Sequence, residues 1–193
     1  MTLTLAIDQG THSTRAAVFD AQGRKLALGR APVDLQPISR SEIEQSPEDI
    51  LMSMEQAISD VLAQPGVVPA AIVQAGLATQ RSSVLAWERS SGRPLSPVLS
   101  WQDTRARAQL TGLEAMSEDI RRRTGLRLSP HYGAGKLQWL LQHSDAVRRT
   151  RDSGELVIGP LASFLLHHLT DTNTDTVDHA NASRTLLWNL QQR

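Results

Sequence analysis

Residues 3–28 read LTLAIDQGTHSTRAAVFDAQGRKLAL, and this stretch decides the fold. Apolar and polar residues alternate in it with a period of two, which is typical of half-buried strands. Two segments of turn composition, residues 9–14 and 20–24, interrupt the alternation, and each holds a glycine where a positive φ is expected. The pattern predicts three short antiparallel strands joined by two hairpin loops.

The next segment predicts a helix that covers a sheet. Residues 31–46 show no sustained period, so we expect an irregular connection there. Ser46 followed by Pro47 is typical of a helix start, and Glu48 and Asp49 favour the positive end of the helix dipole. An apolar face then repeats at helical spacing until Pro65-Gly66 ends the helix.

The rest of the chain alternates strands and helices. Residues 70–77 form an apolar run that predicts a strand buried on both faces, and residues 84–87 and 97–101 predict two more strands. Helical patterns follow at about 103–123, with a break near Gly112, and at 134–143 and 160–169. We expect further strands at 156–158 and 184–190. The fold class is therefore α/β: a mixed sheet, covered on both sides, with an antiparallel meander followed by alternating helices and strands.

Composition excludes several classes of protein. The 193 residues carry 20 Lys+Arg against 20 Asp+Glu, so a nucleic-acid partner is not expected. The absence of cysteine rules out a disulfide framework. No signal peptide and no apolar run of the ~20 residues that cross a bilayer are visible, so we expect a cytoplasmic protein with no membrane partner. Because the chain stops within an apolar, strand-like stretch, we expect it to be a fragment, incomplete at its C-terminus.

The first loop carries the chemistry. An acid, Asp8, closes a strand, Gly10 opens the turn, and hydroxyl residues and Arg15 follow. Backbone N–H groups gathered in a turn bind phosphate, and a carboxylate beside them suits Mg²⁺. The spacing matches neither G-x-x-x-x-G-K-[ST] nor G-x-G-x-x-G. On spacing alone, an ordinary polar hairpin remains the alternative.

Six motifs in order resemble those of the FGGY carbohydrate kinases, and of the glycerol kinase branch most closely. The first is the loop Asp-Gln-Gly-Thr-x-Ser-Thr-Arg-Ala. The other five are residues 44–47 (EQSP), 78–81 (ATQR), 100–105 (SWQDTR), 124–136 (TGL, then SPHY and Lys136) and 181–185 (NASRT).

The resemblance implies an actin-like, ribonuclease-H-like lobe. Residues 1–193 would form the N-terminal, substrate-side lobe of an ATP-dependent sugar or polyol kinase, with the nucleotide lobe absent from this chain. Asp8 would position Mg²⁺, and the full-length protein could be a homo-oligomer. The nucleotide phosphates would meet Gly10, Thr11, His12, Ser13 and Arg15. The sugar or polyol would meet Gln80, Arg81, Ser82, Trp101 and His131.

The sequence departs from the family in two ways. The family's catalytic aspartate lies in a Gly-Asp-Gln segment beyond residue 193, so this chain alone has no general base and is expected to be inactive. His12, Ser82 and His131 stand where the family has Thr, an acid and an aromatic residue. The resemblance implies that the acid and the aromatic residue bind glycerol, so their replacement by Ser82 and His131 argues against glycerol itself. Two alternatives stay open: a truncated, non-catalytic paralogue that binds sugar or a protein partner, and a pentulose kinase of the same superfamily.

Overall fold

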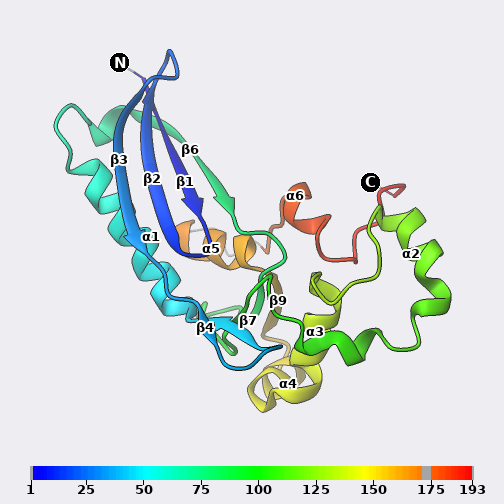
Figure 1. Ribbon diagram of the computed structural model, residues 1–193. Helices are drawn as coiled ribbons and strands as arrows, with labels where there is room; N and C mark the ends of the chain where they lie inside the picture. Colours follow the sequence, from blue (N-terminus) through cyan, green and yellow to red (C-terminus); the bar gives the residue numbers. More distant parts are fainter. Residues whose placement is uncertain (1, 171–174, 193) are drawn as a thin grey trace. The chain divides into compact units, whose positions relative to one another are not determined.

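The computed structural model describes residues 2–170 and 175–192 and divides the chain into two compact units (Figure 1). Unit 1 contains the residues up to 35 together with 45–80. Unit 2 contains residues 36–44 together with the chain from 81 onward.

Unit 1 is a four-stranded sheet with a helix against it. The strands are β1 (Leu3–Gln9), β2 (Ser13–Asp20), β3 (Lys25–Pro32) and β6 (Ile72–Thr79), in the order β3-β2-β1-β6. The first three are antiparallel neighbours, and β6 pairs with β1 in parallel. The predicted meander is therefore confirmed, although β3 continues to residue 32, into the segment expected to be irregular.

The helix of unit 1, α1 (Pro47–Leu62), starts where its sequence predicts. Ser46 is the N-cap, and its hydroxyl accepts a hydrogen bond of 3.0 Å from the backbone N–H of Asp49. The helix packs on β2 and β3. A Cβ at Gly29 would overlap the carbonyl of Ala57, so glycine lets β3 approach the helix closely.

Two expectations about unit 1 are wrong. Strand β6 is mostly exposed instead of buried on both faces, and Val73 keeps 67% of its surface accessible. It is an edge strand, and an apolar run does not distinguish an edge from the centre of a sheet. Gly23 has the expected positive φ of 74°, but Gly10 does not. Glycine suits position 10 because of close packing: a Cβ there would lie 3.2 Å from the Ser13 carbonyl oxygen.

Unit 2 holds a second sheet, where the sequence predicted one sheet. Its order is β4-β5-β8-β7-β9. The strands are β4 (Gln36–Pro37), β5 (Ile43–Gln45), which ends at the unit boundary, β7 (Val84–Glu88), β8 (Val98–Leu99) and β9 (Leu156–Pro160). Trp87 is fully buried and packs edge-on against Phe164.

Helices follow the strands of unit 2. They are α2 (Ser117–Thr124), α3 (Gly133–His143), α4 (Asp145–Asp152), α5 (Leu161–Leu169) and α6 (His179–Ala182), with 3-10 turns η2 (Arg105–Leu110) and η3 (Glu114–Met116); unit 1 has η1 (Pro69–Ala71). The strand expected at 184–190 is a series of turns. No helix in the described ranges is both long and apolar enough to span a membrane.

Candidate functional site

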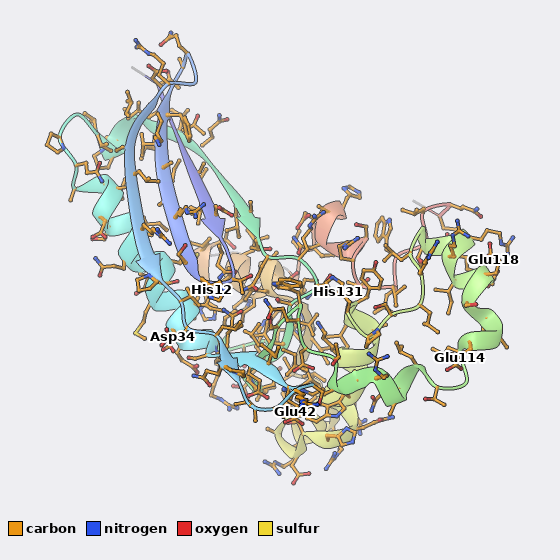
Figure 2. The ribbon with its side chains drawn as sticks, viewed as in Figure 1. His12, Asp34, Glu42, Glu114, Glu118 and His131 are labelled. Carbon is orange, nitrogen blue, oxygen red and sulfur yellow. The ribbon has the colours of Figure 1, made fainter. Side chains whose placement is uncertain are left out.

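The pairing of β1 brings the first group of predicted residues together in unit 1. Asp8 lies opposite Arg15 on β2 and opposite Ala78 on β6, and Gln9 lies opposite Thr79. A carboxylate oxygen of Asp8 is 3.8 Å from an Arg15 guanidinium nitrogen, and both side chains are more than half exposed. The ends of β1 and β2 thus present the acidic side chain of Asp8 and the basic side chain of Arg15 beside the β1–β2 loop, where Figure 2 shows His12.

The loop turns its carbonyl groups into unit 1. The Gly10 carbonyl accepts from the Gln9 side chain at 2.8 Å, and the Thr11 carbonyl accepts from Gln45 Nε2 at 2.9 Å. The His12 carbonyl accepts from the Val33 N–H, and the Ser13 carbonyl from the Gly10 N–H. In a trans peptide the N–H points opposite to the carbonyl. The N–H groups of Thr11 and His12, which follow the Gly10 and Thr11 carbonyls, are therefore directed away from the Gln9 and Gln45 side chains.

Three buried glutamines hold this loop. Gln9 and Gln45 have no exposed surface, and Gln80 keeps 9%. Gln80 Nε2 lies 2.7 Å from Gln45 Oε1 and 3.2 Å from Gln9 Oε1. The sequence predicted Gln80 as a substrate contact, but both protons of its amide nitrogen point to other glutamines. The sequence did not predict that Gln9 and Gln45 support the loop, although both lie in motifs that resemble those of the family.

The second group of predicted residues lies in unit 2. Ser82 begins the turn before β7, adopts a positive φ of 68° and has a buried hydroxyl with no hydrogen-bond partner among the described residues. The next residue, Ser83, accepts a hydrogen bond of 3.0 Å from the Trp101 N–H. This contact places the Ser82 turn beside the Trp101 turn. Arg81, which precedes them, is exposed.

A fully buried lysine ties these two turns together. Lys136 on α3 has no exposed surface, and its Nζ donates to the carbonyls of Ser82 at 3.0 Å and Ser100 at 2.6 Å. Burial, reinforced by Arg105 and opposed by Asp103, lowers the pKa of Lys136 to about 7. Asp103 is itself buried and accepts from the Ile43 N–H and the Arg105 guanidinium.

An aromatic cluster completes the group. The rings of Trp101 and His131 meet edge-on at 5.7 Å, those of His131 and Tyr132 at 5.1 Å, and Arg184 lies over Tyr132. Burial lowers the pKa of His131, and Lys136 and Arg184 lower it further, while a hydrogen bond to the Trp101 backbone opposes them. His131 is therefore neutral at physiological pH.

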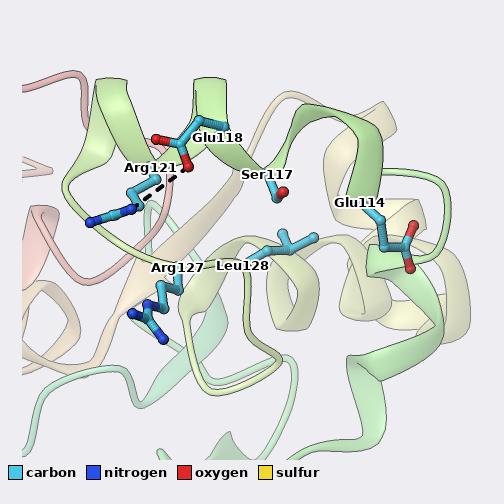
Figure 3. Close-up of a pocket in the computed structure, with 6 residues that line it drawn as sticks. All are labelled: Glu114, Ser117, Glu118, Arg121, Arg127 and Leu128. Atoms are coloured by element: carbon cyan, nitrogen blue, oxygen red, sulfur yellow. Dashed lines mark ion pairs between the residues drawn. The ribbon is translucent and has the colours of Figure 1, made fainter.

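A cavity in unit 2 lies apart from the predicted site residues. A cavity of about 410 Å³ in unit 2 is lined by none of the predicted residues (Figure 3). Its wall carries mixed charge, including an ion pair of 3.7 Å between Arg121 and Glu118. No cluster of three or more His, Cys, Asp or Glu within the described ranges is arranged to hold a metal ion. Asp8 is the carboxylate next to the loop.

Comparison with known proteins assigns the family. The N-terminal domain of the FGGY family of carbohydrate kinases matches residues 3–193. The chain belongs to this family. Its two groups of motif residues thus lie in an FGGY N-terminal domain, and the actin-like lobe implied by the motifs is confirmed.

Glycerol kinases are among the similar proteins. The enzyme of Citrifermentans bemidjiense is 37% identical over 98% of this chain, and that of Thermus brockianus is 37% identical over 99%. A crystal structure of Plasmodium falciparum glycerol kinase with ADP matches all of the chain with a TM-score of 0.88 and 27% identity. A xylulose kinase from Lactobacillus acidophilus, at 19% identity and a TM-score of 0.83, shares the fold. The chain spans 39% of the length of those curated relatives and 38% of both solved chains.

The lowered pKa of Lys136 predicts how stability depends on pH. Above about pH 7 the folded state releases the Lys136 proton, whereas the unfolded chain holds it until its ordinary pKa of 10.5. The unfolded state therefore binds more protons in this window, and the free energy of unfolding rises with pH, by roughly 1.4 kcal/mol per pH unit at most. Urea unfolding of wild type and Lys136→Met at pH 6.5 to 10 measures the difference.

Lys25, the chain's other lysine, supplies the control, because it is exposed at the start of β3. Lys25→Met should follow the wild-type pH dependence. A stability difference between wild type and Lys136→Met that stays constant with pH contradicts the prediction.

Proposed function

We propose that this chain is the substrate-side lobe of a cytoplasmic, ATP-dependent kinase that transfers the γ-phosphoryl group of ATP to a hydroxyl of a sugar or polyol. The observation that carries the proposal is the loop at residues 10–13, whose carbonyls are engaged inside unit 1. N–H groups turned outward in this way form an anion-binding concavity. The FGGY family supplies the reaction class, and a relative crystallised with ADP supports a nucleotide as the anion.

The phosphate side of the reaction belongs to unit 1. Thr11, His12 and Ser13 would bind the nucleotide phosphates, and the exposed guanidinium of Arg15 would add charge. Gly10, whose own N–H donates to the Ser13 carbonyl, would let the phosphates approach because it has no side chain. Asp8 would hold Mg²⁺, which prefers one or two carboxylates together with phosphate and water oxygens. Bound there, the ion would neutralise charge on the transferring phosphoryl group. The buried glutamines fix the loop, which lowers the cost of ordering it around a ligand.

The acceptor side belongs to unit 2. A sugar or polyol presents C–H faces and hydroxyl groups, which suit the Trp101 face and the neutral His131 ring. The Ser82 hydroxyl, buried without a partner in the described structure, would take a hydrogen bond from the substrate. Arg81 would add a forked pair of donors. Gln80 belongs to unit 1, and its contact with the substrate stays a prediction; its side-chain carbonyl oxygen has no hydrogen-bond partner among the described residues.

The proton of the attacking hydroxyl needs a base, and the described residues of the acceptor cluster offer no exposed carboxylate for this role. Asp103 follows Trp101 by two residues, but its oxygens are buried against Ile43 and Arg105. We therefore propose that the base comes from outside residues 1–193 and that this chain alone is inactive. Removal of a general base typically costs 10²–10⁴-fold in rate.

A coupled assay for ADP tests the function. The full-length natural protein should phosphorylate at least one C3 to C6 polyol or ketose, whereas the purified 193-residue chain should not. Turnover by the 193-residue chain would overturn the base assignment. Binding of a sugar without turnover by the full-length protein would favour the alternative of a non-catalytic sugar-binding paralogue.

Substitution of Asp8 tests the phosphate side. In the full-length protein Asp8→Asn should lower kcat at least tenfold, about 1.4 kcal/mol of transition-state stabilisation, and raise the Mg²⁺ requirement, because the metal loses a charged partner. The KM for the sugar should stay within about twofold. Asp60→Asn, on the exposed side of α1, removes the same charge and should change neither quantity. A loss of sugar affinity with turnover spared would make Asp8 a structural residue.

Ser82 and His131 predict the specificity. A carboxylate at position 82 would add about 1.5–3 kcal/mol per charged hydrogen bond to adjacent hydroxyls, which the neutral, shorter Ser82 does not provide. We therefore expect a preference for a polyol or ketose longer than glycerol, which favours a pentulose over glycerol. Kinetic constants across C3 to C6 substrates measure the preference.

The double variant Ser82→Glu with His131→Tyr should shift kcat/KM toward glycerol. Ser91→Glu with His143→Tyr, at exposed positions, is the matched control. The specificity argument fails if the native protein prefers glycerol to every longer substrate, or if the double variant leaves the ratio unchanged.

A further inference from the structure

We propose that Lys136 is a positioning residue for the acceptor substrate: it fixes the Ser82 turn and the Trp101 turn relative to each other within unit 2. Its effect on catalysis rests on the proposed kinase function. The structural part of the inference concerns this chain alone and is measured separately.

Strand pairing gives these two turns little support. Strand β8 is only two residues long, and its register with β7 consists of the single pair Val84–Leu99. Ser82 lies just before β7, and Ser100 just after β8. The Lys136 ammonium donates hydrogen bonds to the carbonyls of Ser82 and Ser100. It therefore connects the two chain segments next to the Val84–Leu99 pair.

The backbone at Ser82 needs such a tie. A positive φ in a residue with a side chain is held only where the surroundings enforce it. Ser82 has a φ of 68°, and Leu186 is the other non-glycine residue at positive φ within the described part of the chain. The Lys136 bond to the Ser82 carbonyl fixes that peptide, and the Ser83 carbonyl accepts a hydrogen bond of 3.0 Å from the Leu161 N–H, which fixes the next. The Ser83 hydroxyl accepts from the Trp101 N–H at 3.0 Å. The backbone that carries the Ser82 hydroxyl is thereby held in one conformation.

The chemistry of lysine suits this position. The charged form has three N–H donors and the neutral amine has two, so both forms can serve two carbonyls. The ionisable or charged groups that act on it are Asp103, Arg105 and His131, and the first two form their own ion pair. Loss of the Lys136 proton near neutral pH therefore leaves both hydrogen bonds in place. Lys136 thus holds the two carbonyls at all physiological pH values.

Substitution separates positioning from folding. Lys136→Met keeps the length and bulk of the side chain and removes both donors. Lys136→Gln keeps two N–H donors on a shorter side chain, and Lys25→Met is the control at the other lysine. In the full-length protein, we expect Lys136→Met to raise the KM for the sugar or polyol at least tenfold while the KM for ATP stays within twofold. The Gln variant should recover part of the loss, and Lys25→Met should match wild type.

A second readout uses the 193-residue chain without any activity. The four tryptophans give four indole N–H signals in ¹⁵N-labelled protein, assigned by single Trp→Phe changes. The Trp101 signal should move in Lys136→Met and move less in Lys136→Gln, while the Trp188 signal stays in place. If the natural protein proves to have no kinase activity, the proposed function fails, and this spectrum alone decides the inference.

Three results would overturn the proposal. The first is an unchanged Trp101 signal in a folded Lys136→Met chain. The second is a parallel rise in the KM values for sugar and ATP. The third is the failure of both Lys136→Met and Lys136→Gln to fold, because Lys136 would then serve stability and not position.

Discussion

The position of β1 between an antiparallel and a parallel partner governs the whole of unit 1. Antiparallel pairing with β2 brings the chain back after a short loop, so Asp8 faces Arg15. Parallel pairing with β6 sends the end of β6 to the same edge of the sheet, with Thr79 opposite Gln9. A loop between antiparallel strands and the end of a parallel strand thus meet at one edge. This arrangement gathers polar groups from β1 and β2 with Thr79 of β6, which lies 70 residues after Gln9 in the sequence.

In both units, buried polar side chains donate hydrogen bonds to backbone carbonyls. Gln9 and Gln45 bind the carbonyls of Gly10 and Thr11, and Lys136 binds those of Ser82 and Ser100. A buried carbonyl left without a donor costs about 1–3 kcal/mol, so each such side chain makes one loop conformation preferable to its alternatives. The family motifs therefore contain two kinds of residue: exposed groups such as Asp8 and Arg81, and buried groups that shape the loops carrying them.

Sequence reasoning recovered the elements that depend on local signals. The alternation over residues 3–28 and the Ser46-Pro47 helix start are confirmed, because both are set by a few neighbouring residues. It failed where tertiary context decides. The apolar composition of β6 did not reveal an edge strand. The bonds of Gln80 to Gln9 and Gln45 also depend on tertiary context, whereas its contact with a substrate stays a prediction. Lys136 belonged to a quoted motif, but its role needs the two carbonyls that folding brings to it.

The charge state of His131 bears on what the acceptor cluster recognises. Burial lowers its pKa, and the two neighbouring cations, Lys136 and Arg184, also disfavour a proton on the ring. A neutral imidazole has one donor and one acceptor, whereas a protonated one has two donors and a charge that carbohydrates, being uncharged, do not match. Burial and the Arg184 guanidinium that covers Tyr132 thus keep His131 in the form that a hydroxyl can both donate to and accept from. In the proposed acceptor site, specificity at this position would then depend on the reach of the ring, which is shorter than that of a tyrosine phenol, and not on its charge.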